Sequence, residues 1–430
     1  MNRQLSTWIP GTPASFATRS EKTWKEQLLT CLSHSKYYHS SLELKFVLPE
    51  TSLVYKGHDL DNLCDPVFSV LASSLGWFEG KQSNIDGWQA VKTIGNNTGL
   101  ELRQVRRIEE KIPEKAIIFS DCYYGKIPHG ALDPEIPRWL QKFDKLETSS
   151  NNIGISLVFV NHRRSIASLS DGMVKHVIDC LYPLYGGIGG RPNDHLISNL
   201  TIKRIQVPGI QQHIKVIMWD CEKVEKHKQK LKSFVAHLID ELYLINEYFN
   251  AYITLYNKQA TDVDTLNHAH TFFIMVLHAF LHQFVIMLCR IYEDNSRNNP
   301  NTIPSLINYL ECNGEYIIST KSELQKVLLE CRSLLDSQSL NLKKLKTLRD
   351  KTLVHNDRKW IDGNIWQQTS PTIGGYRSLI TVSHEILCII SKQLDLPTPI
   401  LGMGVKSDID WLINFLKDRL EKHTEIDALH

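Results

Sequence analysis

The 430-residue sequence lacks an excess of charge of either sign, because 49 Lys and Arg residues balance 47 Asp and Glu residues. A net charge of +2 excludes a protein that coats nucleic acid through its overall charge alone. An apolar content of 42% and a charged content of 22% also exclude a disordered or collagen-like chain. Any surface for a charged partner must therefore be local.

Paired cysteines and an export signal are missing as well. The nine cysteines are scattered, without a CxxC pair or zinc-type spacing to histidine, so we expect free thiols in a reducing compartment. The N-terminal segment MNRQLSTWIPGTP has no apolar core of the kind a signal peptide needs. We therefore expect a cytoplasmic protein.

One apolar run, Phe272 to Leu288, approaches the length of a membrane span. His278, His282 and Gln283 lie in its middle, where a hydrocarbon environment would make them costly. We interpret the run as a buried helix of a bundle and expect no membrane partner. The two histidines, one turn apart without a third candidate ligand, are interpreted as core residues rather than metal ligands.

The pattern of the chain changes near residue 222. Before it, short β-type runs alternate with helical stretches and glycine or proline breaks; after it, long helical patterns continue almost without strands. The length fits two to four domains. We expect an α+β protein with domains at residues 1–125, 126–222 and 223–430, the last an all-α bundle.

The part before residue 222 contains an internal repeat of five elements in one order. A helix with an early tryptophan leads to a strand, an acidic turn that opens a helix, a strand that begins with an acid, and a final strand ending in FSDC or MWDC. We infer a duplicated α/β module. The acids that recur, 99 to 110 residues apart, are Asp61 and Asp171, Asp86 and Asp194, and Asp121 and Asp220.

Asp59 and Asp61 flank Leu60 in the acidic turn of the first copy. If this segment is extended, both carboxylates point to one face, and Asp86 on the next strand adds a third oxygen ligand suited to Mg²⁺. A bound Mg²⁺ would activate water against a phosphodiester. The alternative is that Asp61 only caps the helix that follows it.

These residues resemble the RusA-type Holliday-junction resolvases, whose motif is D-x-D-N-x-x-K-x-x-x-D-A-L followed by a strand with D-D-x-Q-I. The first copy keeps Asp59, Asp61 and Asn62. It departs from the motif at Asp65, where the family has lysine, and at Gly87, where the family has the second acid of the strand.

The second copy departs at other positions. It has Leu169 and Gly172 in place of the first Asp and the Asn, but keeps Lys175. Because the family acts as a Mg²⁺-dependent homodimer on DNA junctions, the resemblance implies a fused pseudo-dimer. Three interpretations stay open: a hybrid site, one weakened metal site in the first copy, or a degenerate pair that only binds nucleic acid. The acids of the second copy are Asp171, Asp179 and Asp194.

Basic residues near these acids are candidates for phosphate contacts, although such clusters also occur on solvated faces. We expect them to serve nucleic-acid binding together with Lys175. They are Arg103, Arg106, Arg107, Arg163 and Arg164.

In the helical half, a basic stretch leads to Arg349 and, six residues later, His355. On a regular helix these two residues lie about 120° apart, so a joint site needs a helix that bends or ends, or a second chain. Their chemistry suits RNA without a metal: His355 as general base or acid on a 2′-hydroxyl, and Arg349 on the phosphate. The alternative is a surface pair at a helix end.

The spacing R-[polar]-x4-H on a late helix resembles the HEPN superfamily, and the continuation to Asp357 resembles its abortive-infection U branch, R-D-K-x-x-x-H-x-D. The segments LCRIYED (288–294) and SLINYL (305–310) are similar to that branch too. The resemblance implies a dimer that cuts RNA across its interface in toxin or antiphage systems, although some relatives are inactive partners. Asp350 and Asp357 would position Arg349 and His355, or would pair with neighbouring basic residues.

The leading hypothesis is a homodimeric endonuclease of conflict type. Its HEPN-like half would be a metal-independent endoribonuclease, and its RusA-like half would bind or sense DNA. One alternative is a Mg²⁺-dependent endonuclease for branched DNA that uses the helical half only to dimerise. Another is an inactive nucleic-acid-binding subunit controlled by a regulatory partner protein.

Overall fold

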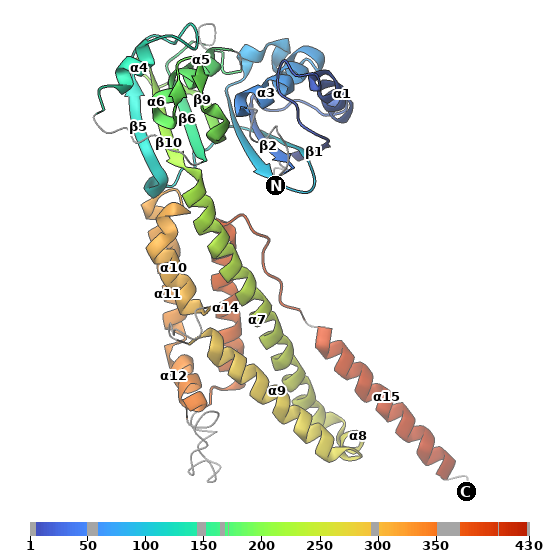
Figure 1. Ribbon diagram of the computed structural model, residues 1–430. Helices are drawn as coiled ribbons and strands as arrows, with labels where there is room; N and C mark the ends of the chain where they lie inside the picture. Colours follow the sequence, from blue (N-terminus) through green and yellow to red (C-terminus); the bar gives the residue numbers. More distant parts are fainter. Residues whose placement is uncertain are drawn as a thin grey trace. The chain divides into compact units, whose positions relative to one another are not determined.

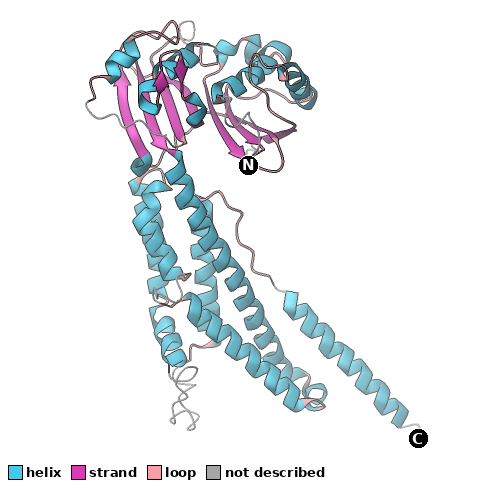
Figure 2. Ribbon diagram, viewed as in Figure 1, coloured by secondary structure: helices cyan, strands magenta, loops and turns pink. Residues whose placement is uncertain are grey.

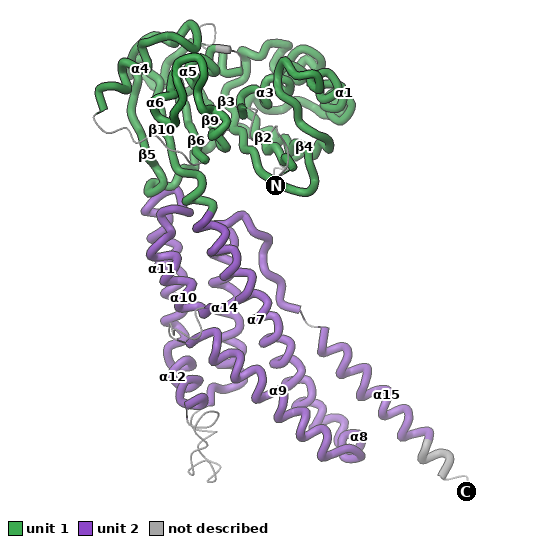
Figure 3. The backbone as a smooth tube through the Cα atoms, viewed as in Figure 1, with its two compact units in different colours: residues 1–225 green, residues 226–430 purple. Residues whose placement is uncertain are grey.

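The structure, a computed structural model, describes residues 6–49, 59–143, 152–163, 168–170, 172–293, 301–350, 370–402 and 404–427. The chain divides into two compact units, residues 1–225 and 226–430 (Figure 3). The described strands all lie in unit 1, and unit 2 is built from helices (Figure 2). The α+β class expected from the sequence is thus confirmed.

Unit 1 is built on one eight-stranded mixed sheet with the order β1-β4-β2-β3-β9-β6-β10-β5, beside a two-stranded pair of β7 and β8. The strands are β1 (Ser6–Pro10), β2 (Ser41–Leu48), β3 (Gly87–Ile94), β4 (Gly99–Val105), β5 (Ile117–Tyr123), β6 (Ile153–Val160), β7 (Gly187–Ile188), β8 (Arg191–Pro192), β9 (Ile197–Ile205) and β10 (His213–Asp220).

The two halves of this sheet have the same pairing pattern. β2 pairs parallel with β3 and antiparallel with β4, and β6 pairs parallel with β9 and antiparallel with β10. The outer strands β1 and β5 pair antiparallel with β4 and β10, while β3 and β9 join the halves by antiparallel pairing. Each strand of the second half begins 110 to 114 residues after its counterpart.

Helices cover this sheet and close its core. α3 packs against β3 and β9 at the centre of the sheet and against α1, while α4, α5 and α6 contact one another (Figure 1). One apolar cluster joins these helices to both halves of the sheet. The helices are α1 (Glu21–Leu32), α3 (Leu60–Ser69), α4 (Glu135–Leu140), α5 (Gly172–Cys180) and α6 (Tyr182–Tyr185), with short turns η1 (Val70–Ser74), η2 (Trp77–Gly80), η3 (Gln82–Asn84), η4 (Glu114–Ala116) and η5 (Asp194–Leu196).

The seam between the halves is held by side chains as well as by strand pairing. The buried Trp88 of β3 donates its indole N–H to the carbonyl oxygen of Leu169 at 2.6 Å. Ser170 donates to the carbonyl oxygen of Gln82 at 3.1 Å. Unit 1 is therefore one folded body in which the two halves share a core.

The pairs of strands that occupy equivalent positions in the two halves of the sheet differ in one case from the pairs that the sequence repeat aligned. The repeat aligned the strand ending at Asp121 with the strand ending at Asp220. These strands, β5 and β10, are instead direct neighbours, with Asp121 opposite Val216. By position in the sheet, the counterpart of β10 is β4, and the counterpart of β5 is the edge strand β1. Neither β1 nor β4 was predicted from the sequence.

Unit 2 consists of helices that share two apolar clusters, the larger one formed by α7, α9 to α12 and α14. A smaller cluster joins Ile409 and Ile413 of α15 to α7, α8 and α9. The helices are α7 (Cys221–Thr261), which begins just before the unit boundary, α8 (Val263–Asn267), α9 (His270–Ile291), α10 (Ile303–Asn313), η6 (Gly314–Tyr316), α11 (Lys321–Ser337), α12 (Ser339–Leu348), α14 (Ile373–Gln393) and α15 (Gly404–Asp427).

Three helices of unit 2 start at a threonine that caps them. The hydroxyl of Thr302, Thr320 or Thr372 accepts a hydrogen bond from the backbone N–H three residues later, at 3.0 to 3.2 Å. Such caps satisfy amide groups that have no partner inside the helix. They explain why α10, α11 and α14 begin where they do.

The apolar run of α9 is only partly buried. Residues near its end, including Phe284, Val285 and Leu288, belong to the core, whereas Phe272, Met275 and Ile286 are exposed. Among the described helices, α9 is long and apolar enough to cross a bilayer, but one such helix is weak evidence because a core helix meets the same criteria. The bundle helix expected from the sequence is present as α9, and its buried side chains gather mainly toward its C-terminal end.

The contact between Gly154 of β6 and Trp219 of β10 generates a stability prediction. These residues are opposite each other, and a Cβ atom on Gly154 would overlap the indole ring. Gly154→Ala should therefore lower the free energy of unfolding by about 1–3 kcal/mol, as overpacking usually does. Gly130→Ala is the control, because a Cβ there meets open space. Chemical denaturation of both variants tests this, and equal stability would contradict the packing argument.

Candidate functional site

Arg349 follows α12 directly and lies where that helix meets α9. Leu345 and Leu348 are buried, and the Cys289 thiol donates to the carbonyl oxygen of Leu345 at 3.7 Å. The backbone stays helical at Arg349, with φ −54° and ψ −54°. Packing of α12 on α9 thus positions the arginine beside the end of α9.

Two carboxylates orient the guanidinium of Arg349. Glu293, just after α9, accepts from Nη1 at 3.3 Å. Asp350 accepts from Nε at 2.8 Å and lies 2.7 Å from Nη2. Neighbouring Tyr292 is anchored in the core, because its hydroxyl donates to the carbonyl oxygen of Leu379 at 2.8 Å and contacts Ser383. The guanidinium is therefore held between two acids from separate segments.

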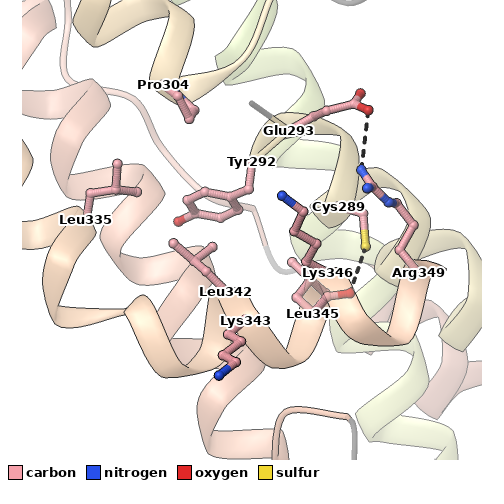
Figure 4. Close-up of a pocket in the computed structure, with 10 residues that line it drawn as sticks. All are labelled: Cys289, Tyr292, Glu293, Pro304, Leu335, Leu342, Lys343, Leu345, Lys346 and Arg349. Atoms are coloured by element: carbon pink, nitrogen blue, oxygen red, sulfur yellow. Dashed lines mark hydrogen bonds and ion pairs between the residues drawn. The ribbon is translucent and has the colours of Figure 1, made fainter. Parts of the chain in front are cut away.

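Arg349 lines a cavity of about 430 Å³ in unit 2 (Figure 4). Lys343 and Lys346 of α12 line the same cavity, so among the described lining residues three cationic side chains accompany one acid, Glu293. The remaining lining is mostly apolar. Such a cavity suits a ligand with an anionic group, since a partly apolar surrounding strengthens charge-assisted hydrogen bonds. The lining consists of Cys289, Tyr292, Glu293, Pro304, Leu335, Leu342, Lys343, Leu345, Lys346 and Arg349.

The structure places only part of the site expected in the helical half. Arg349 and Asp350 lie together as described, but His355 and Asp357 fall outside the described residues. Their geometry relative to Arg349 is therefore left as a prediction. No role was predicted from the sequence for Glu293 or Lys343. The signal for Glu293 was the aromatic-acid segment LCRIYED, in which Glu293 is the residue that contacts Arg349.

Unit 1 contains a second group of charged residues, drawn from both halves of the sheet. Lys175 of α5 lies 3.2 Å from Asp61, 3.8 Å from Asp59 and 3.9 Å from Asp179. Asp61 and Asp179 are buried, and burial raises the pKa of Asp61 above its ordinary value and that of Asp179 to about 6. Burial alone would lower the pKa of Lys175, but the three carboxylates raise it overall.

Asp194 and Lys92 complete this group, which we call the seam cluster. Asp194 shares a hydrogen bond with Asp59, and burial, followed by the charge of Asp59, raises its pKa to about 8. Lys92 of β3 is only 3% exposed and donates to the carbonyl oxygen of His195 at 2.8 Å. Burial lowers the pKa of Lys92 to about 8. The seam cluster comprises Asp59, Asp61, Lys92, Lys175, Asp179 and Asp194.

The seam cluster differs from the metal site expected from Asp59, Asp61 and Asp86. Asp86 accepts from the hydroxyl of Ser40 at 2.7 Å, whereas the ammonium of Lys175 lies among the other carboxylates. Across the described residues, no group of three or more His, Cys, Asp or Glu side chains could hold a metal ion. Lys175, which we expect to contact nucleic acid, is paired in the structure with Asp61, 114 residues earlier.

The other basic candidates lie apart from the seam cluster. Arg103 of β4 is paired with Glu43 and Glu101, at 3.3 and 3.6 Å. Arg106, Arg107 and Arg163 are exposed. Arg164 and Asp171 fall outside the described residues.

Lys92 is the member of the seam cluster that sequence reasoning missed. On β3, Trp88, Ala90 and Lys92 share the buried face. A lysine at the third position of an otherwise apolar buried face is the signal that could have identified it, because a buried ammonium requires acceptors nearby.

The raised pKa of Asp194 makes the stability of unit 1 depend on pH. Between about pH 4 and pH 8, folded Asp194 holds a proton that the unfolded chain has lost, so the free energy of unfolding falls as pH rises through that window. Asp194→Asn keeps a donor for Asp59 without the charge. At pH 8.5 we expect this variant to be more stable than the wild type, by on the order of 1–3 kcal/mol, and at pH 4 nearly equal.

Chemical denaturation across this pH range measures the difference between variant and wild type. Asp86→Asn is the control, because Asp86 bonds Ser40 rather than the seam cluster. A stability difference that does not change with pH would contradict the assignment of a shared proton to Asp194 and Asp59.

Comparison with known protein families identifies a match in the helical unit. Residues 228–389 match the model of the family HEPN_AbiU2, described as AbiU2. No curated protein and no solved structure matches the chain. The matched region covers most of α7, then α8 to α12 and most of α14, and thus includes Arg349, Glu293 and the described lining of the cavity. The match suggests a nuclease-type function in abortive infection or defence, and the C-terminal unit carries a HEPN domain of the AbiU2 type.

Proposed function

We propose that the protein is a cytoplasmic endoribonuclease of the abortive-infection type, which cuts RNA with Arg349 and His355 and without a metal. The observation that carries the proposal is that Arg349 lies, held by Glu293 and Asp350, at the wall of a cation-lined cavity inside the region that matches the HEPN family. His355, at the spacing typical of that family, would exchange the proton of the 2′-hydroxyl.

The contacts of Arg349 support a role on phosphate. In the free protein its Nε and Nη2 atoms both lie against one oxygen, Oδ1, of Asp350, and Nη1 donates to Glu293. A phosphate would offer the guanidinium two oxygens in bidentate geometry. Lys343 and Lys346 line the same cavity and would add to the attraction for the scissile phosphate. Glu293 and Asp350 would keep the guanidinium in place before RNA arrives.

Variants at Arg349 and His355 test the catalytic proposal with RNA cleavage assays in the presence of EDTA. His355→Ala should reduce the rate at least about 100-fold, as loss of a general acid or base does. Arg349→Lys should also reduce the rate, by roughly 10-fold or more, because an ammonium cannot form the bidentate contact.

Arg332→Lys is the matched control, because Arg332 forms an exposed pair with Glu311 away from the cavity. It should retain the wild-type rate. Cleavage that survives His355→Ala, or that EDTA abolishes, would contradict the proposal.

We further propose that the protein is a homodimer that uses the exposed face of α9. Phe272, Met275 and Ile286 are 59%, 66% and 47% exposed, and they recur at spacings of three and eleven residues along the helix. Exposed apolar residues that share one face of a helix can mark a contact with another protein. A second copy would cover them and supply the dimer that the HEPN resemblance implies.

The mass in solution, measured by light scattering after gel filtration, tests the dimer. Met275→Glu should convert a dimer to a monomer, because a carboxylate would be buried without a partner. Leu329→Glu on α11 is the matched control, since Leu329 is similarly exposed on another helix. A wild-type monomer, or equal effects of both variants, would contradict the use of α9.

For unit 1 we propose a pair of RusA-like modules that bind DNA rather than cut it. The shared order of elements and the mirrored sheet support a duplicated module, with the boundary between β4 and β5 rather than after residue 125. The position of Lys175 among Asp59, Asp61 and Asp179 favours binding over metal-dependent cleavage, because the ammonium already balances these carboxylates.

A further inference from the structure

A group of basic and aromatic side chains lies where the first turns of α7 meet α10 and η6, outside the cavity of Arg349. We define the lysine–aromatic patch as Lys226, His227, Lys230, Tyr309 and Tyr316. Tyr309 belongs to α10, and Tyr316 ends η6. The Arg349 site does not use any of these residues.

The rings of the lysine–aromatic patch are held in fixed positions. His227 stacks on Tyr316 with ring centroids 4.6 Å apart and ring planes 8° from parallel. Its Nδ1 atom lies 2.9 Å from the hydroxyl of Tyr309, in hydrogen-bond contact. Phe234 supports Tyr309 from the side of the core, with centroids 5.8 Å apart. The three rings thus form a preorganised platform, and each is partly exposed.

Two lysines flank this platform. The ammonium of Lys230 lies 5.0 Å from the ring centroid of Tyr309, and Lys226 is one turn earlier on the same side of α7. Both lysines are exposed, and among the described residues neither has an ion-pair partner. Since an ion pair would lower their attraction for an anion, the lysines remain available for phosphates.

We propose that the lysine–aromatic patch binds single-stranded RNA, as a second contact for the substrate of the proposed nuclease, on which this inference rests. Aromatic faces stack on unpaired bases without regard to sequence, and lysines beside them neutralise the backbone. A base pair inside a duplex offers no free face for such stacking, so single strands are the ligand. The patch would hold RNA independently of the groups that cut it.

The chain supplies a matched control on the same helix. At about 100° per residue, Lys226 and Lys230 lie about 40° apart around α7, whereas Lys228 and Lys232 lie about 120° to 160° from them, on the other flank. Replacing both lysines of either pair by glutamine removes two positive charges, and the two lysines are four residues apart in each pair. Of these four lysines, Lys230 is the one whose ammonium is recorded over the ring of Tyr309, and Lys226 shares its side of the helix.

The experiment measures binding of a fluorescent 20-nucleotide single-stranded RNA by anisotropy in full-length protein with His355→Ala, at several salt concentrations. The variant with Lys226→Gln and Lys230→Gln should bind about tenfold more weakly. Its salt slope should fall by about 1.4, because each of the two lysines that no longer meets a phosphate lowers the slope by about 0.7. The variant with Lys228→Gln and Lys232→Gln should bind like its parent.

Tyr316 tests the stacking contribution. Tyr316→Leu should weaken binding about tenfold, whereas Tyr316→Phe keeps the ring and should preserve affinity. Thermal unfolding of both variants shows whether either substitution impairs folding. If Tyr316→Leu is as stable as Tyr316→Phe, it should still bind RNA more weakly.

Three results would overturn the inference: no binding of RNA, equal effects of the two lysine pairs, or competition by duplex RNA as strong as by the single strand. Binding that depends on the patch, in a wild-type protein that cuts no RNA, would support the patch and contradict the proposed catalysis. Cleavage that depends on His355, together with RNA binding that does not change in the patch variants, would support the proposed catalysis and contradict the role of the patch.

Discussion

The antiparallel pairing of β3 with β9 is the contact on which unit 1 depends. It turns two four-stranded halves into one sheet, and α3 packs over the junction. Without this pairing, β3 and β9 would each present an open edge with unpaired backbone groups. The same junction buries Lys92, so an ammonium within the sheet requires acceptors from the neighbouring chain segments. The seam cluster is therefore a consequence of how the halves join.

In unit 2, a comparable constraint acts on Arg349. The cation is anchored by the packing of α12 on α9 and by acids on either side of it. Removal of one acid would leave the guanidinium less ordered rather than unpaired, because the other remains. Two acids from separate segments therefore fix the orientation of the guanidinium as well as balance its charge. This is the preorganisation that transition-state stabilisation by an arginine requires.

Parts of this arrangement were accessible from the sequence. The change from mixed to helical pattern near residue 222 was visible because apolar periods of two and of 3.6 residues differ clearly. Arg349 and Asp350 were found through a short motif whose residues are adjacent. The edge strand β1 was missed because five residues that end in proline are too few to show the apolar period of a strand, and its pairing with β4 defines it instead.

The seam cluster was only half predicted for a similar reason. Its acids were recognised, but a partner 114 residues away could not be assigned to Lys175 from local pattern, because the contact is created by the sheet. Asp86 showed the opposite error: it follows the motif, but it accepts a hydrogen bond from Ser40, 46 residues earlier, and is not a member of the cluster. Local motifs identify the residue types, and the long-range pairing decides which of them meet.

The order of strands is mirrored between the two halves of the sheet, but three charged residues of the seam cluster have apolar counterparts in the opposite half. The residues that occupy the places of Lys175, Asp179 and Lys92 in the opposite half, by the offsets of α5 and β9, are Leu63, Val67 and Ile202, and all three are fully buried in the apolar core. Among the described residues, the two halves therefore differ in polarity at these three positions, and the mirror relation of the strands does not extend to the charges at the seam.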